Sequence, residues 1–162
     1  LIYSYRLQKK KKDFFNGNVY FSYKFKNKQK ILNNFRIILN SGIRLPHLNF
    51  FPHPNPYNLK DQKILKEKLL EIYQNNKAVK KESGQKVAIV IGISTMIFFL
   101  LEHGIEVIHF HSNDNFEKLN TKGWKNITVR DINSSISIYK LKKYGSLIKM
   151  KKNKQILKLG NL

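Results

Sequence analysis

Apolar residues gather in one long passage, residues 86–111, which reads KVAIVIGISTMIFFLLEHGIEVIHFH. Val87–Ile91 is a continuous run rich in β-branched residues, which is typical of a strand buried on both faces. Gly92 interrupts the run, a helical stretch continues to Leu101, and Ile105–Phe110 resumes a β pattern. A strand, a helix and a second strand over about 25 residues normally bring the two strands parallel through a right-handed crossover. The passage therefore predicts a small βαβ core.

The helix of this unit has recognisable ends. Ser94 or Thr95 can cap its beginning, and Gly104 stands where helices commonly end in a left-handed residue. The uncharged stretch 87–101 is shorter than the roughly 20 apolar residues that cross a bilayer. We therefore expect buried core here and no membrane span.

A β-hairpin and a helix are predicted before this passage. Asn16-Gly17 suits the two positive φ values of a type I′ turn. Apolar and polar residues alternate over 19–26, which predicts a half-buried strand. Helical spacing follows and ends at Gly42. The apolar residues at that spacing are Ile31, Leu32, Phe35, Ile38 and Leu39.

Four prolines fall within segment 45–58. Because proline lacks an N–H and fixes φ, this segment cannot form a regular helix or an interior strand, and we predict an extended path. Asn58 can cap a second helix, which runs to about Asn76 with one apolar face. Beyond the βαβ unit, Ile127–Arg130 and Ile136–Tyr139 read as two strands or one bent strand.

These elements predict an α/β (or α+β) fold with three parts. Residues 1–60 form a basic N-terminal extension with the hairpin, the helix and the Pro-rich segment. Residues 61–139 form a compact core, which is built around a small βαβ core at residues 86–139. Residues 140–162 form a Lys-rich C-terminal tail.

Charge supports this division. The chain of 162 residues holds 31 Lys and Arg against 10 Asp and Glu, a net charge of +21. Residues 1–60 carry +11, residues 61–139 only +2, and residues 140–162 carry +8 with no acid. Codons rich in A and T explain part of the lysine excess, but they do not explain why acids are scarce. A nearly neutral core with basic ends indicates a polyanionic partner.

The cations are spaced to meet several phosphates, which position an RNA without reading its bases. Tyrosines at 3, 5, 20, 23, 139 and 144 lie among them and could stack on unpaired bases. The alternative is a solvated lysine surface that reflects codon bias. The predicted RNA-binding residues are Lys9, Lys10, Lys11, Lys12, Lys24, Lys26, Lys28, Lys30, Arg36, Arg44, Lys140, Lys142, Lys143, Lys149, Lys151, Lys152 and Lys154.

Two patterns raise the question of a cofactor or metal. Gly92 follows a buried strand, but the turn reads GISTMI and holds only the first of the three glycines of a dinucleotide-binding turn. His109 and His111 share one strand face and could share a metal, with His103, Asp114 or a distant residue as third ligand. We favour a structural turn and polar packing, and predict neither cofactor nor metal.

Catalytic patterns are not recognisable. The chain has no cysteine, so it has no thiolate nucleophile, disulfide or zinc–thiolate site. It has neither a nucleophile turn nor a Gly-rich phosphate loop ending in Lys-Ser/Thr. Nothing in the sequence brings two of the possible acid–base groups together, so we predict that the protein is not an enzyme. Those groups are Glu102, Glu106, Asp114, Glu117 and Asp131.

Small size, richness in Lys, Asn and Ile, a compact α/β core and basic extensions resemble organelle-encoded ribosomal proteins. The resemblance covers the whole chain and is one of composition and architecture. It implies a structural constituent of a mitochondrial ribosome in the organelle matrix, whose core docks on rRNA while extensions thread between RNA helices and neighbouring ribosomal proteins. It implies no small-molecule substrate. Two alternatives remain: a divergent nucleotide- or cofactor-binding enzyme with a degenerate turn at Gly92, and an accessory subunit of a respiratory complex.

Overall fold

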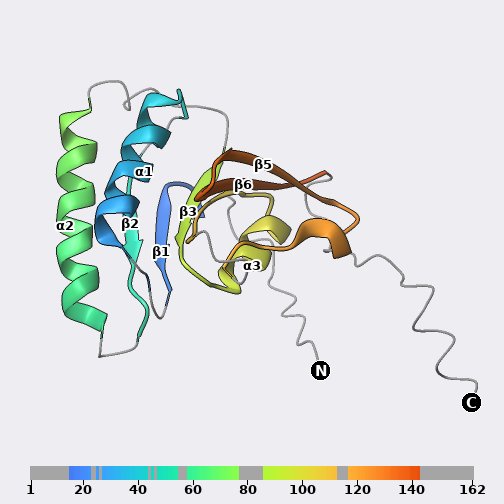
Figure 1. Ribbon diagram of the computed structural model, residues 1–162, viewed down its shortest axis with the longest axis horizontal. Coiled ribbons are helices and arrows are strands. Elements are labelled where there is room, and N and C mark those ends of the chain that lie inside the picture. The colour runs from blue at the N-terminus through green and yellow to red at the C-terminus, as the bar shows by residue number, and fades with distance from the viewer. Residues whose placement is uncertain are drawn as a thin grey trace, which may run out of the picture.

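A computed structural model describes residues 15–22, 25, 27–43, 45, 47–54, 58–76, 86–112 and 117–142. These residues form one mixed six-stranded sheet and three α-helices, so the α/β prediction is confirmed (Figure 1). The elements in chain order are β1 (Asn18–Phe21), α1 (Lys28–Asn40), β2 (Asn49–Phe51), α2 (Leu59–Asn75), β3 (Val87–Ile91), α3 (Met96–Glu102), β4 (Glu106–Phe110), the 3-10 helix η4 (Thr121–Gly123), β5 (Ile127–Asn133) and β6 (Ile136–Leu141).

One strand of the sheet, β6, runs antiparallel to both of its neighbours. Its strand order is β2-β1-β3-β4-β6-β5, and the first four strands are parallel. In register, Val19 of β1 is paired with Ile89 of β3, which is paired with Ile108 of β4. The last two strands form an antiparallel pair, and β6 joins it to β4. The βαβ unit predicted over 86–111 is therefore confirmed, and 127–141 forms two strands.

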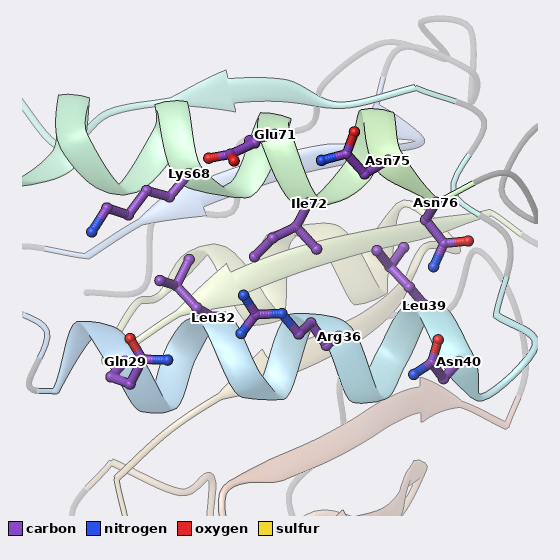
Figure 2. A pocket seen from close by; sticks show the side chains of 10 residues that line it. All are labelled: Gln29, Leu32, Arg36, Leu39, Asn40, Lys68, Glu71, Ile72, Asn75 and Asn76. Atoms are coloured by element: carbon purple, nitrogen blue, oxygen red, sulfur yellow. The ribbon is translucent and has the colours of Figure 1, made fainter.

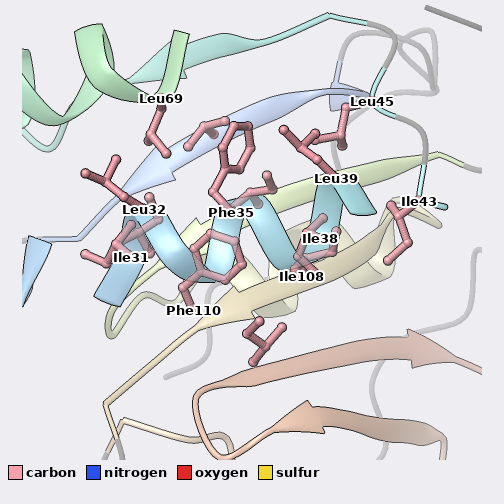
Figure 3. Packing of buried hydrophobic residues seen from close by; sticks show 14 of the residues in the cluster. Ile31, Leu32, Phe35, Ile38, Leu39, Ile43, Leu45, Leu69, Ile108 and Phe110 are labelled. Atoms are coloured by element: carbon pink, nitrogen blue, oxygen red, sulfur yellow. The ribbon is translucent and has the colours of Figure 1, made fainter. Parts of the chain in front are cut away.

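Helices cover both faces of the parallel strands: α1 and α2 lie on one face and α3 on the other (Figure 1). Val19 and Phe21 of β1 pack in the cluster beneath α1 and α2, whereas Tyr20 packs in the cluster beneath α3. Figure 3 shows the buried side chains of α1 above Ile108 and Phe110 of β4. Strands covered on both faces carry apolar residues at every position, as β3 does.

The sequence of α1 accounts for its bounds and its packing. Asn27 adopts φ 53° before the helix, and its side-chain oxygen accepts a hydrogen bond from the Lys30 N–H at 3.0 Å. Gly42 adopts φ 79° just after it, a conformation that costs glycine little. Each apolar side chain between these ends is worth roughly 1.5–3 kcal/mol when fully buried. Those buried are Ile31, Leu32, Phe35, Ile38 and Leu39.

The apolar stretch 87–101 is divided between a buried strand and a short helix. The Met96 N–H donates to the Ser94 hydroxyl at 3.1 Å, and Gly104 adopts φ 74° beyond the helix. The seven residues of α3 are too few to cross a bilayer. Within the described part of the chain, no helix is both long enough and apolar enough to span a membrane.

Two expectations for β1 are wrong. A parallel strand occupies each of its edges, so Asn16-Gly17 does not turn a hairpin against it. Instead Gly17 lies between strands: its N–H donates to the Val87 carbonyl at 2.7 Å, and its carbonyl accepts from the Asn49 N–H at 3.2 Å. The strand is buried on both faces, because helices cover both, and is not half-buried.

The described parts of the predicted N-terminal extension belong to the sheet and its core. β1 is an interior strand between β2 and β3, and α1 supplies much of the apolar cluster on one face. The sheet is thus larger than the small core predicted around 86–139. Within the Pro-rich segment, β2 is a three-residue strand at the sheet edge, where missing N–H donors are tolerated.

Candidate functional site at the carboxyl edge of the sheet

Five of the predicted RNA-binding residues lie within the described part of the chain: Lys28, Lys30, Arg36, Lys140 and Lys142. The remaining twelve lie outside the described residues: Lys9, Lys10, Lys11, Lys12, Lys24, Lys26, Arg44, Lys143, Lys149, Lys151, Lys152 and Lys154.

The five fall in separate places. Lys28 and Lys30 are in the first turn of α1, which follows the carboxyl end of β1. Lys140 is near the end of β6, which runs antiparallel to β4, so it lies at the opposite, amino edge of the parallel strands. Lys142 follows at the same amino edge, where its N–H donates to the Asn126 carbonyl at 2.9 Å. The structure therefore does not bring these cations into one cluster.

Two of these cations are held in ion pairs. Lys28 Nζ lies 2.5 Å from the Asp61 carboxylate, and both side chains are exposed. Lys140 Nζ lies 2.5 Å from Glu106, whose side chain is only 9% exposed. Lys140 therefore partly compensates the charge of a buried carboxylate, whereas the exposed pair of Lys28 contributes little to stability.

Arg36 lies in a groove of about 740 Å³ between α1 and α2. Figure 2 shows Leu32, Arg36 and Leu39 projecting from α1 toward α2, with Ile72 of α2 facing them. Arg36 Nη1 donates to the Asn33 side-chain oxygen at 3.0 Å. Lys68 and Glu71 line the same groove, so its rim has mixed charge.

A second pocket, of about 270 Å³, lies at the carboxyl edge of the parallel strands. The chain adds β2 on one side of β1 and β3 on the other, so the direction in which strands are added reverses between β1 and β3. Open α/β sheets bind ligands in the crevice beside such a reversal, at the carboxyl ends of the strands. The pocket is lined by Phe25, Asn27, Lys30, Ile31, Asn34, Ile91, Gly92, Phe110, His111, Ser112 and Glu117.

One cation and one carboxylate line this pocket. Lys30 comes from α1 and makes no ion pair with any other described residue. Glu117 comes from the loop after β4, and one of its oxygens accepts the Ser112 N–H at 2.5 Å. Asn34 is fixed by hydrogen bonds to Ser135, including 3.2 Å from its amide nitrogen to the Ser135 hydroxyl. The pocket thus carries one positive and one negative side chain beside the hydrogen-bonded amide of Asn34.

The backbone of Gly92 is hydrogen-bonded to strand β4. Its N–H donates to the Phe110 carbonyl at 2.8 Å, and its carbonyl accepts from His109 Nε2 at 2.9 Å. The N–H, the only one of these two groups that could donate to a pyrophosphate, is therefore already used. The geometry supports the interpretation of this glycine as a structural turn, although it still borders the pocket.

His109 is completely buried beneath this turn. Burial lowers the pKa of His109 to about 4, since desolvation disfavours the imidazolium, and the hydrogen bond to Gly92 opposes that shift only in part. His109 is therefore neutral near pH 7, with the proton on Nε2, which donates a hydrogen bond to the Gly92 carbonyl.

His111 lies in a row of polar contacts that ends at the surface. Its Nδ1 donates to the Ser112 carbonyl at 2.8 Å, and its Nε2 lies 2.9 Å from the Ser137 hydroxyl. That hydroxyl donates to Asp131 at 2.6 Å, and Lys118 holds the other carboxylate oxygen at 2.6 Å. Burial lowers the pKa of His111, and the hydrogen bond from Lys118 lowers the pKa of Asp131.

The two histidine rings lie 5.1 Å apart, as expected for neighbours on one strand face. Their ring nitrogens are directed to protein groups. Among the described residues no three His, Cys, Asp or Glu side chains gather as a metal site would require. Asp114, one possible third ligand, lies outside the described residues.

Two of the tyrosines expected to stack on bases are buried. Tyr139 is inaccessible, and its hydroxyl accepts from the Leu119 N–H at 3.2 Å. Tyr20 packs beneath α3 and accepts from the Asn18 amide at 2.9 Å. Both lie in interior strands, so the expectation is wrong for them. The tyrosines at 3, 5, 23 and 144 lie outside the described residues.

Sequence reasoning missed this pocket, although it noted Lys30, Gly92, His111 and Glu117 separately. The miss follows from treating β1 as part of an extension, which removed the carboxyl end of β1 from the core. The signal was present: strands alternating with helices of 13 and 17 residues indicate a doubly wound parallel sheet.

Comparison of the chain with protein-family models, with curated proteins and with solved structures found no match.

Proposed function

We propose that this protein is a structural RNA-binding protein, a constituent of an organellar (mitochondrial) ribosome that contacts rRNA and neighbouring ribosomal proteins. The observation that carries the proposal is the distribution of charge. Residues 1–60 and 140–162 hold 20 cationic side chains and a single acid, Asp13. Ribosomal RNA supplies phosphates at the density that such segments need.

The protein cannot neutralise this charge from within. Its 10 carboxylates are outnumbered by 31 cations in any arrangement of the chain. Several carboxylates are already paired in the described core, as in Lys118–Asp131 and Lys140–Glu106. A partner with many anionic groups therefore lowers the free energy of the protein far more than a neutral one would.

Lysine predominates over arginine in these segments. An ammonium group acts as a point charge without the planar fork with which arginine reads a guanine edge. The expected contacts therefore go to phosphates and hold the protein in place on a folded RNA.

The dependence of RNA affinity on salt tests the proposal. For the full-length protein on rRNA fragments, we expect log Kd to rise by about 0.7–0.9 per decade of salt for each phosphate contacted. Substitution of Lys149, Lys151 and Lys152 by Gln should reduce this slope. The matched variant replaces three lysines of the middle segment, Lys63, Lys66 and Lys125, and should reduce it less. A flat salt dependence, or equal losses in both variants, contradicts the proposal.

Co-sedimentation locates the partner. The tagged full-length protein should travel with a ribosomal subunit in a sucrose gradient and leave it when the RNA is digested. Travel with membrane-bound respiratory complexes after RNA digestion would favour an accessory respiratory subunit instead.

The pocket beside Gly92 favours a second candidate, a divergent nucleotide- or cofactor-binding enzyme. It lies where open α/β sheets bind such ligands and is lined by both Lys30 and Glu117. Calorimetry with a panel of nucleotides and cofactors separates the two functions. Saturable binding of a free cofactor, together with weak RNA binding, would favour the enzyme.

A further inference from the structure

The pocket at the carboxyl edge offers aromatic surface and two charges in a small volume. Phe25 contributes a partly exposed ring, Lys30 an ammonium and Glu117 a carboxylate, while Phe110 is buried beneath them in the core. Its volume of about 270 Å³ lies just below the usual range for drug-sized ligands, which begins near 300 Å³. A dinucleotide is too large for it, whereas a single base with part of its sugar is of suitable size.

Glu117 can recognise the edge of a base. One carboxylate oxygen is fixed by the Ser112 N–H at 2.5 Å, and no described residue donates to the other. An ionised carboxylate only accepts hydrogen bonds. It therefore favours a base with an exocyclic amino group, such as cytosine, over uracil, which presents a carbonyl oxygen at the same position.

Lys30 supplies the phosphate contact. Its ammonium is not paired with any described carboxylate, and the first turn of α1 holds no acidic residue. In the sequence, lysines 24, 26, 28 and 30 alternate with the pocket-lining residues Phe25 and Asn27. A phosphate that approaches the pocket therefore meets the ammonium of Lys30.

We propose, on the basis of the RNA-binding function above, that this pocket receives one unpaired nucleotide of the bound RNA. Its base lies against Phe25 and donates its exocyclic amino group to Glu117, and its phosphate lies near Lys30. Base–aromatic stacking of this kind is how proteins usually hold single-stranded nucleotides. A free nucleotide has the same chemistry, so the experiment separates the two sources.

The base contact is tested with single-stranded oligo(rC) and oligo(rU) of about eight nucleotides, which differ at position 4 of the ring. The full-length protein should bind oligo(rC) about ten-fold more tightly. Glu117→Gln should abolish that preference while still accepting the Ser112 N–H, so that the loop is maintained. Glu67→Gln, an exposed carboxylate on α2, is the matched control and should preserve the preference.

The phosphate contact is tested with Lys30→Gln. This variant should weaken oligo(rC) and oligo(rU) equally and lower the salt slope by about 1. Lys63→Gln, which removes an exposed lysine from α2, should change neither quantity as much. The amide resonance of Ser112 should shift on addition of oligo(rC), and circular dichroism should show every variant folded.

The outcomes are distinct. Equal, salt-dependent binding of both oligonucleotides overturns the nucleotide pocket and leaves the RNA-binding function standing. Binding of 5′-CMP as tight as that of oligo(rC) overturns the RNA source and assigns the pocket to a free nucleotide. Failure to bind either oligonucleotide or folded rRNA overturns both proposals.

Discussion

The buried histidine beneath Gly92 makes the stability of the protein depend on pH. The pKa of His109 is about 4 in the folded protein and 6.5 in its ordinary, exposed state. The unfolded chain therefore binds more protons between these values. The resulting stability is present above pH 6.5 and is lost as the pH falls toward 4.

Unfolding in urea at two pH values measures this effect. We expect the wild-type protein to lose about 2 kcal/mol more between pH 7 and pH 5 than His109→Gln loses. Glutamine is a suitable replacement because its amide can still donate to the Gly92 carbonyl. His111 is present in both proteins, so its own titration cancels. Equal losses in the two proteins would show that His109 is already accessible to protons in the folded state.

Two lysines predicted to bind RNA should differ sharply in their effect on stability. Lys140→Met leaves the carboxylate of Glu106 buried without its lysine, and we expect a loss of about 1–2 kcal/mol. Lys28→Met removes an exposed pair and should change stability by less than about 0.5 kcal/mol. Chemical denaturation checks both. A larger effect at Lys28 than at Lys140 would contradict the burial argument.

Two glycines between elements, Gly17 and Gly42, adopt positive φ angles that other residues rarely adopt. Gly17 adopts φ 73°, and an added Cβ would lie 2.2 Å from the His47 carbonyl oxygen. Gly42 adopts φ 79° after α1, but nothing lies within 4 Å of its Cβ position. Gly17 therefore allows strands β1 and β2 to begin side by side, whereas Gly42 only allows the chain to turn.

Alanine at each position separates steric overlap from backbone strain. Gly42→Ala should cost about 1 kcal/mol, the price of a left-handed conformation alone. Gly17→Ala should cost more than about 2 kcal/mol, because the backbone of His47 must also move. Thermal and chemical unfolding of both variants give the comparison. Similar losses would mean that the 47–49 segment yields easily.

Element bounds were predictable wherever local signals agreed. The apolar run of β3, the helical spacing of α1 and its stop at Gly42 each correspond to the structure. Strand neighbours were not predictable in the same way. Asn16-Gly17 is a strong hairpin signal, yet both edges of β1 are occupied by strands that are distant in sequence. Tertiary pairing overrode the local turn preference.

The whole molecule shows where the lysine-rich C-terminal segment can be removed. The predicted tail begins at Lys140, but β6 continues to Leu141, which is 1% exposed. A protein ending at Lys142 keeps every described element, whereas one ending at Tyr139 loses a buried leucine. We expect the second to melt about 5–10 °C below the first. Equal melting temperatures would show that Leu141 adds nothing to the core.

The candidate site was predictable only in part, because its residues meet through the arrangement of the whole sheet. The sequence identifies Lys30, Glu117 and Gly92 as isolated features. They come together only when β1 is placed beside β3 in the sheet. Charge segregation can be read directly from the sequence, because it needs no knowledge of which strands are neighbours.

The direction of the first and last strands has a consequence for how the molecule sits in an assembly. β1 begins, and β6 ends, at the amino edge of the parallel strands. Lys140 and Lys142 therefore lie at that edge, while Lys30 and the small pocket lie at the other. An RNA that met both sets of cations, as we propose, would have to span at least the length of β4, five residues or about 16 Å.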